Sequence, residues 1–246
     1  LAQEIGPRRI RQYAMTMGIS TPIRPVWSIG IGTSEVRLLN LLAAYCVFPN
    51  KGIYVEPTAV ARVEDSDGNV VSEPVSAARE VLRPSVAVLM TDLMRSAIDE
   101  SGGTGHAVQT VYGFRTAAAG KTGTTNDYTD AWFIGFTPHL AAGVWMGVDG
   151  PPQISLGDGQ MGNVAALPAW VEFMQAAYDT LSLPYAEFKK PDGIVQLGIC
   201  QITKELVTPN CPVEKEYFIK KYSPSGKCQL HSKTNPNSLR RRSDFD

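Results

Sequence analysis

The chain has 246 residues, of which 43 % are hydrophobic and 19 % are charged, and its formal net charge is -1. This composition excludes an intrinsically disordered protein, because a chain of this size has enough apolar side chains to bury a core. The charge balance gives no support for nucleic-acid binding, and no apolar run reaches the roughly 18 residues of a membrane span. Leu1 opens into what reads as the inside of a helical region, so we expect the N-terminus to be a cut in a longer protein.

Two helices are predicted in the first part of the chain. Residues 1–20 place apolar and basic side chains on different sides at helical spacing, and Gly18 is a suitable stop. The second helix is expected to begin at Glu35, with Thr33 or Ser34 as its cap, and to end at residues 50–52.

The pattern then changes to short runs rich in valine. These runs, over residues 53–81, flank the turn at 65–69, which predicts a β-hairpin. Pro84 suits the first turn of the amphipathic helix that follows. The glycine-rich residues 101–105 are not followed by the Gly-Lys-Ser/Thr of a phosphate-binding loop, so we expect a flexible connector there.

Three consecutive strands are predicted next, over residues 114–125, 130–137 and 140–148. Large apolar side chains alternate onto both faces of these strands, so helices should cover both faces of the sheet. Residues 163–181 supply one such helix. The predicted fold class is therefore α+β, an antiparallel sheet covered by helices.

The composition becomes polar and irregular after residue 190. We therefore expect one domain at residues 1–190 and a cysteine-containing extension at 191–246, which is partly disordered because residues 223–246 are rich in Ser, Pro, Asn and Arg.

Four cysteines are present, and three of them lie in this extension. Cys46 is expected to be a buried apolar side chain, whereas Cys200, Cys211 and Cys228 cluster near His231. Three cysteines and one histidine are the right ligand types for zinc, but the separation of the first two is wrong for the usual paired ligands, so no metal is predicted. One disulfide, Cys200 with Cys211 or Cys211 with Cys228, is preferred, and its connectivity stays open.

The strongest chemical signal is the sequence Lys-Thr-Gly-Thr-Thr, which begins at Lys121. On a strand, Thr122 and Thr124 share one face, whereas Lys121 and Thr125 share the other. Two hydroxyls can then donate to one carboxylate, and the lysine adds a positive charge. Gly123 allows a ligand or another backbone to approach closely, and a strand at a sheet edge can pair with an extended peptide. Without its context, so short a motif is typical of a surface turn.

Four segments around this motif occur together in one known family. They are Gly103-Thr104-Gly105, residues 118–125 (AAGKTGTT), residues 130–138 (DAWFIGFTP) and residues 143–149 (GVWMGVD). Together they resemble the transpeptidase domain of class A (bifunctional) penicillin-binding proteins, over roughly residues 1–180. Lys-Thr-Gly is a signature of these enzymes, together with Ser-x-x-Lys and a Ser-x-Asn triplet.

The resemblance implies the fold of penicillin-binding proteins and serine β-lactamases, incomplete at the N-terminus, and a serine-type D-Ala-D-Ala transpeptidase activity. It implies that Lys121, Thr122, Gly123, Thr124 and Thr125 bind substrate, with Lys121 and the backbone N–H of Thr124 in catalytic roles, the latter as an oxyanion-hole donor. The implied partners are a peptidoglycan stem peptide ending in D-Ala-D-Ala and β-lactams, with no cofactor. The implied location is the periplasmic face of the bacterial inner membrane, in a membrane-anchored protein with a glycosyltransferase domain upstream.

Two signatures of the family are absent from this sequence. No serine stands three residues before a lysine, and there is no Ser-x-Asn triplet. We therefore expect this chain alone to be inactive and to form no covalent β-lactam adduct, since loss of the nucleophile costs about 10⁶ in turnover. Two alternatives stay open: a D,D-carboxypeptidase or β-lactamase of the same fold, and a non-catalytic module that binds a peptide carboxylate.

Overall fold

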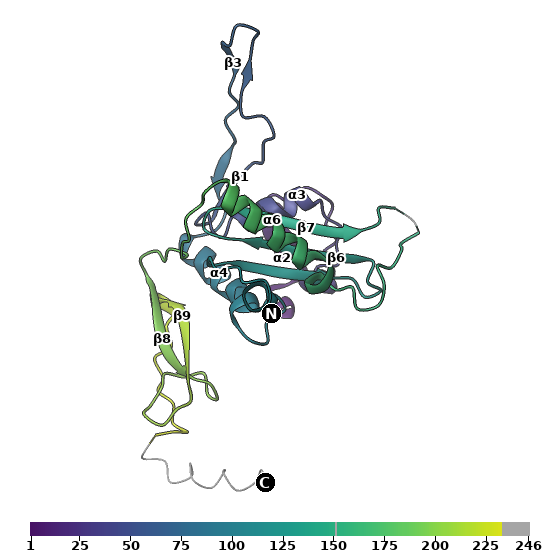
Figure 1. Ribbon diagram of the computed structural model, residues 1–246. Coiled ribbons are helices and arrows are strands. Elements are labelled where there is room, and N and C mark those ends of the chain that lie inside the picture. Colours follow the sequence, from purple (N-terminus) through teal and green to yellow (C-terminus); the bar gives the residue numbers. More distant parts are fainter. Residues whose placement is uncertain (151, 233–246) are drawn as a thin grey trace. The chain divides into compact units, whose positions relative to one another are not determined.

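The computed structural model of the chain describes residues 1–150 and 152–232 (Figure 1). The chain divides into two compact units, which we name unit 1 (Leu1–Lys189) and unit 2 (Lys190–Asp246). Within the described residues, no helix has the length and apolar character that crossing a membrane would require.

The centre of unit 1 is an antiparallel sheet of three strands. These are β5 (Ala119–Thr124), β6 (Asp130–Phe136) and β7 (Ala141–Gly147), in the spatial order β5-β6-β7. The positions of β6 and β7 agree with the sequence prediction, whereas β5 begins at Ala119 rather than at Phe114. Because β5 pairs with β6 alone among the described strands, it lies at an edge of the sheet.

Helices pack on both faces of this sheet, as predicted. On one face, α6 (Leu167–Thr180) contributes Trp170 to a buried cluster with Phe133 of β6. On the other face, Phe136 packs against Met94 of α4 (Pro84–Asp99) and against Phe48, which follows α3 (Leu38–Cys46). Figure 1 shows α6 lying across the sheet. The α+β fold class is therefore confirmed.

Trp170 fixes α6 against the sheet. Its side chain is fully buried, and its Nε1–H donates to the carbonyl oxygens of Ala142 (3.1 Å) and Gly135 (3.3 Å). The indole also meets the ring of Phe133 edge to face, with 5.1 Å between the centroids. A Cβ at Gly135 would lie 2.7 Å from the indole, so only glycine leaves room for this ring.

The remaining elements of unit 1 are short. They are α1 (Ala2–Ile5), α2 (Pro7–Thr16), η1 (Trp27–Ile31), β1 (Ile53–Val55), β2 (Val63–Glu64), β3 (Val70–Ser72), β4 (Ala78–Glu80), α5 (Ala107–Thr110) and the π-helical turn η2 (Gly162–Ala166). Strand β1 pairs with β4, and β2 pairs with β3 as the hairpin predicted around residues 65–69. In that hairpin, hydrogen bonds from Asn69 lower the pKa of the Asp65 carboxyl.

Two helix predictions near the N-terminus were wrong in detail. The single helix expected over residues 1–20 is two helices, because Gly6 has φ 83° and Pro7 starts a new helix. Helix α3 begins at Leu38 and has no side-chain cap. Thr33, one of the two expected caps, instead pairs its hydroxyl with that of Ser28 (Oγ1 to Oγ, 3.0 Å).

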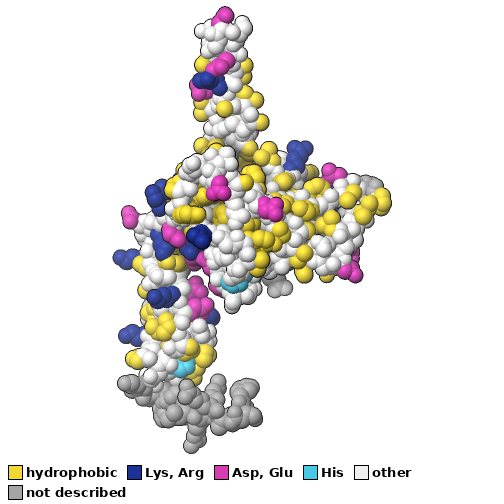
Figure 2. Space-filling view, viewed as in Figure 1, with side chains coloured by type: hydrophobic (Ala, Val, Ile, Leu, Met, Phe, Trp, Pro, Cys, Tyr) yellow, Lys and Arg dark blue, Asp and Glu magenta, His cyan; other side chains and the backbone are white. Residues whose placement is uncertain are grey.

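Unit 2 is built on the antiparallel hairpin of β8 (Ile194–Cys200) and β9 (Val213–Ile219), followed by the short turn η3 (Lys220–Tyr222). Of the extension expected to be mobile, residues 233–246 lie outside the described residues. Before them, Lys227 forms a bridge with Leu206 and Cys228 is fully buried, so the segment packs on the hairpin loop. Hydrophobic side chains gather over much of unit 1, whereas Lys, Arg, Asp and Glu side chains are scattered (Figure 2).

Candidate functional site

Strand β5 presents the Lys-Thr-Gly sequence along its unpaired edge. The backbone N–H of Thr125, just after β5, donates to the carbonyl oxygen of Asp130 at the start of β6 (3.2 Å). Hydrogen-bonding groups alternate in direction along an antiparallel strand, so the backbone groups of Thr122 and Thr124 point away from β6. The N–H of Thr124 therefore lies on the free edge of the sheet.

The hydroxyls of Thr122 and Thr124 lie on one face of β5, as the period of two predicts. Thr122 is half-buried, and its Oγ1 lies 2.9 Å from Oγ1 of Thr104. Thr124 is exposed, and its Oγ1 accepts a hydrogen bond from the N–H of Gly162 (3.0 Å). Each hydroxyl can donate one hydrogen bond. Because Thr124 only accepts from Gly162, its hydroxyl hydrogen is free to donate to a ligand. The Thr104–Thr122 bond uses one of the two hydroxyl hydrogens, so the other can also donate to a ligand.

Lys121 starts on the opposite face of β5, but its ammonium reaches the same edge. Its Nζ donates to the carbonyl oxygen of Thr122 (3.0 Å), and the side chain is otherwise exposed. The site therefore combines one positive charge, hydroxyl donors and a free backbone N–H. This set of donors suits an anionic group at the end of an extended ligand.

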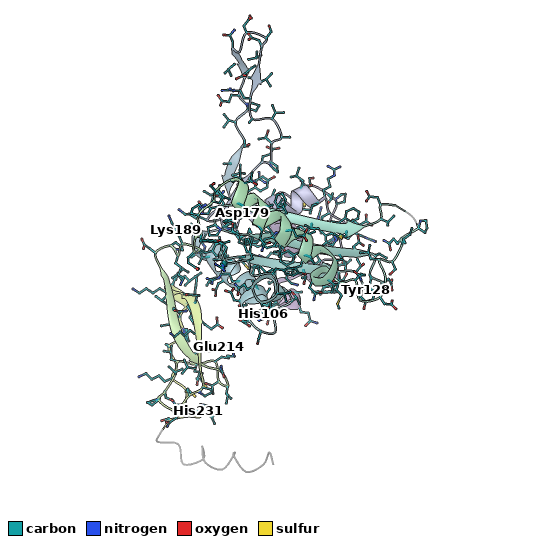
Figure 3. All side chains as sticks on the ribbon, viewed as in Figure 1. His106, Tyr128, Asp179, Lys189, Glu214 and His231 are labelled. Atoms are coloured by element: carbon teal, nitrogen blue, oxygen red, sulfur yellow. The ribbon has the colours of Figure 1, made fainter. Side chains whose placement is uncertain are left out.

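Thr125 belongs to the turn between β5 and β6. Its Oγ1 accepts from the backbone N–H groups of Asp130 (2.8 Å) and Thr129 (3.0 Å), which satisfies the turn. The turn contains Tyr128, which Figure 3 labels. It is also tied to the chain before η2, because the N–H of Leu156 donates to the carbonyl oxygen of Tyr128 (2.8 Å). These contacts give Thr125 a structural role, and substrate binding by its side chain stays a prediction.

Glycines allow η2 to approach β5. A Cβ at Gly162 would lie 2.4 Å from the carbonyl oxygen of Trp132 and 2.7 Å from that of Gly123. A Cβ at Gly123 would meet the side chain of Trp132 at 3.1 Å. The backbone of η2 can therefore reach the Thr124 hydroxyl only because Gly162 carries no side chain, whereas a side chain at Gly123 would crowd Trp132 of β6.

Residues 101–105 are a packed turn rather than the flexible connector expected. The N–H of Gly105 donates to the carbonyl of Ala97 at the end of α4 (2.7 Å), and a Cβ at Gly103 would lie 2.3 Å from the same oxygen. Nδ1 of His106 lies 3.0 Å from the carbonyl of Ile98. Thr104 is thereby held where its hydroxyl meets Thr122. In the sequence, Thr104 stands out only through the family resemblance, and no local signal points to Gly162.

The cysteines differ from the sequence prediction. All four are free thiols, so neither predicted disulfide is formed. The side chains of Cys200, Cys211, Cys228 and His231 converge, and their sulfur and nitrogen atoms all lie within 4.8 Å of one another. The sequence separation that argued against a ligand cluster was misleading, because strand pairing brings these residues together.

Two family models match separate parts of the chain. Residues 1–153 match the model of the penicillin-binding protein transpeptidase domain. Residues 190–233 match the model of the C-terminal domain of penicillin-binding protein 1A.

Individual relatives give the same result. The chain is 32 % identical over 228 residues to penicillin-binding protein 1A of Aquifex aeolicus, which covers 93 % of this chain and 30 % of that protein. It is also 32 % identical over 228 residues to penicillin-binding protein 2D of Bacillus subtilis, covering 91 % of this chain and 32 % of the relative. The chain thus spans about a third of the length of these curated relatives.

A solved structure supports the fold. The crystal structure of penicillin-binding protein 1A from Haemophilus influenzae superposes with a TM-score of 0.82 at 24 % sequence identity. The superposition covers 92 % of this chain and 38 % of that one.

Proposed function

Since this chain belongs to the penicillin-binding protein transpeptidase family, we propose that it provides the wall of the active-site cleft that binds the substrate carboxylate in a D,D-transpeptidase. The chain corresponds to the C-terminal part of class A members. The enzyme so formed cross-links peptidoglycan stem peptides that end in D-Ala-D-Ala, and it binds β-lactams. Its place is the periplasmic face of the inner membrane, in an anchored protein that also has a glycosyltransferase domain.

One observation carries this proposal: β5 is an edge strand whose free side combines Thr122, Thr124 and the Lys121 ammonium. An extended peptide that adds to this edge would place its terminal carboxylate among these donors. Charge-assisted hydrogen bonds to a carboxylate are stronger than neutral ones, so the terminal anion dominates recognition. Gly123 keeps the strand narrow enough for a ligand to approach its backbone.

The same edge serves the chemical step. In acyl transfer by a serine enzyme, the hydroxyl attacks the D-Ala-D-Ala carbonyl, and the developing oxyanion needs fixed N–H donors. The outward N–H of Thr124 is one such donor, and losing one donor typically costs about 10²–10³ in rate. Lys121 supports the proton network of the reaction. The attacking serine belongs to a Ser-x-x-Lys signature that this sequence does not contain.

Thr122→Val in the active enzyme that contains this chain tests the binding role. A hydrogen bond to a charged group contributes about 1.5–3 kcal/mol, so the rate of acylation by a fluorescent penicillin should fall about 10- to 100-fold. Thr122→Ser keeps the hydroxyl and should recover most of the rate. Thr180→Val, at an exposed position at the end of α6, is the matched control and should leave the rate unchanged. Equal rates for Thr122→Val and Thr180→Val would refute the proposal.

The isolated chain tests the absence of a nucleophile. Incubated with a labelled penicillin, the 246-residue polypeptide should show no covalent mass shift. Noncovalent binding of a D-Ala-D-Ala peptide to this chain, abolished by Thr122→Val, would show that the edge strand binds without chemistry. A stable adduct on any serine of the chain would contradict the proposed inactivity.

The products formed by the active enzyme distinguish a transpeptidase from a D,D-carboxypeptidase. With an acceptor stem peptide present, a transpeptidase yields a cross-linked dimer and releases D-Ala. A D,D-carboxypeptidase releases D-Ala and leaves a shortened monomer, and that outcome would replace the proposed reaction while keeping the proposed site.

A further inference from the structure

Unit 2 gathers three thiols and one imidazole at the loop end of its hairpin. The donor atoms of Cys200, Cys211, Cys228 and His231 all lie within 4.8 Å of one another. Nδ1 of His231 lies 3.4 Å from Sγ of Cys200 and 3.3 Å from Sγ of Cys228. We propose that these four side chains bind one zinc ion, which holds unit 2 together.

The distances suit tetrahedral zinc. With Zn–S bonds of about 2.3 Å and Zn–N bonds of about 2.0 Å, neighbouring ligand atoms of a tetrahedron are about 3.5–3.8 Å apart. The two nitrogen-to-sulfur distances are close to this range, so the ion can enter with small movements of the side chains. Thiolate and imidazole ligands in a four-coordinate set favour zinc over magnesium or calcium, which prefer oxygen. Four protein ligands leave no open position, and the site is therefore structural rather than catalytic.

Backbone pairing holds the cysteines in place before any metal binds. The β8–β9 register sets Cys200 opposite Val213, which puts Cys211 at the same end of the hairpin. The N–H of Cys228 donates to the carbonyl oxygen of Leu206 in the hairpin loop (2.8 Å), and this bond brings the third thiol to the cluster. His231 lies three residues after Cys228 in the sequence.

A neighbouring residue supports one of the ligands. Thr208 donates its backbone N–H to Sγ of Cys211 (3.2 Å), and its Oγ1 lies 3.3 Å from the same sulfur. Hydrogen bonds of this kind stabilise a metal-bound thiolate and fix its orientation, as partners outside the ligand set commonly do in metal sites.

The burial pattern of unit 2 explains why it needs such a site. Among the described residues of this unit, the buried side chains are those of Ile199, Cys200 and Cys228. A unit of fewer than about 70 residues rarely folds on its own apolar core and commonly depends on a disulfide or a metal. A disulfide would use two of the three thiols and leave the third beside the imidazole. A zinc ion uses all four groups.

Metal analysis of the full chain tests the proposal directly. The chain is purified with a reductant, loaded with zinc chloride and dialysed, and its zinc is then measured. We expect about one zinc per chain, the stoichiometry of a single four-ligand site. Cys228→Ser and His231→Ala should lose the metal, whereas His231→Cys should retain it, since four cysteines also form a zinc site. Cys46→Ser is the matched control, because Cys46 lies in α3 of unit 1, and it should retain the metal.

A second measurement covers variants that fail to fold. In the wild-type chain, removal of zinc with a chelator should speed proteolysis within residues 190–232. Tryptophan fluorescence, which comes from unit 1 alone, should stay unchanged. The proposal is overturned by wild-type protein that holds no zinc after loading, or by peptide mapping that finds any two of Cys200, Cys211 and Cys228 joined in a disulfide. Neither result bears on penicillin acylation, so this proposal and the proposed function fail independently.

Discussion

Replacement of Gly162 by alanine tests whether η2 holds the Lys-Thr-Gly strand in place. The new Cβ would lie 2.4 Å from the carbonyl oxygen of Trp132 and 2.7 Å from that of Gly123, and neither backbone atom can move without shifting a strand. Overpacking of this kind costs about 1–3 kcal/mol. The displaced N–H also gives up its bond to Thr124, which contributes about 1 kcal/mol. The free energy of unfolding of unit 1 should therefore fall by about 2–4 kcal/mol.

Tryptophan fluorescence during heating measures this effect on unit 1 alone, because all 4 tryptophans of the chain lie in that unit. At about 2–4 °C per kcal/mol for a domain of this size, the midpoint should fall by about 4–16 °C. Gly102→Ala is the matched control, since no atom lies within 4 Å of its added Cβ, and it should stay within about 0.5 kcal/mol of the wild type. If Gly162→Ala and Gly102→Ala melt at the same temperature, η2 does not pack on β5 as the distances require.

Three further substitutions and treatments test other parts of unit 1. Tyr178→Phe removes the hydrogen bond from its hydroxyl to Oγ1 of buried Thr137 (2.6 Å) and should lower the free energy of unfolding by about 0.5–1.5 kcal/mol in chemical denaturation; no loss would mean that water replaces the bond. Trp145→Phe removes the hydrogen bond from Nε1 to the Asp130 carboxylate (2.8 Å) and should lower the free energy of unfolding by about 1–3 kcal/mol. An unchanged midpoint of denaturant unfolding would contradict this. Burial raises the pKa of the Cys46 thiol, so the native protein should carry less thiolate there at pH 8 and react more slowly with iodoacetamide than the unfolded chain; equal rates would show that Cys46 is accessible.

The sheet of unit 1 was predictable because its signal is local. Residues in β6 and β7 are large and apolar on both faces, and short apolar runs of this length between turn signals are typical of strands that are covered on both sides. The start of α3 was less predictable. Thr33 is a good N-cap residue in isolation, but its hydroxyl is engaged by Ser28, and the helix begins at Leu38 without a side-chain cap. The preference of threonine for the N-cap position is therefore outweighed here by its hydrogen bond to Ser28, which capping rules do not predict.

The candidate site was predictable only in part, for the same reason. A period of two is enough to put Thr122 and Thr124 on one face of a strand, and the structure agrees. The residues that meet their hydroxyls, Thr104 and Gly162, are 18 and 38 positions away along the chain. Such contacts depend on how α4 and η2 pack against β5, which neither propensity nor local spacing specifies.

The same limit applies to the cysteine cluster of unit 2, which is proposed to bind zinc. Spacing rules for zinc ligands assume that each pair of ligands comes from one short turn, and by that rule Cys200 and Cys211 are too far apart. In this protein a hairpin separates these two cysteines instead of a turn. The β8–β9 register sets Val213 opposite Cys200, so Cys211, just before β9, lies near the end of β8. The hydrogen bond from the N–H of Cys228 to the carbonyl oxygen of Leu206 brings Cys228 to the hairpin loop, and His231 lies three residues further on. The spacing of these ligands in the sequence therefore does not by itself decide whether their donor atoms converge.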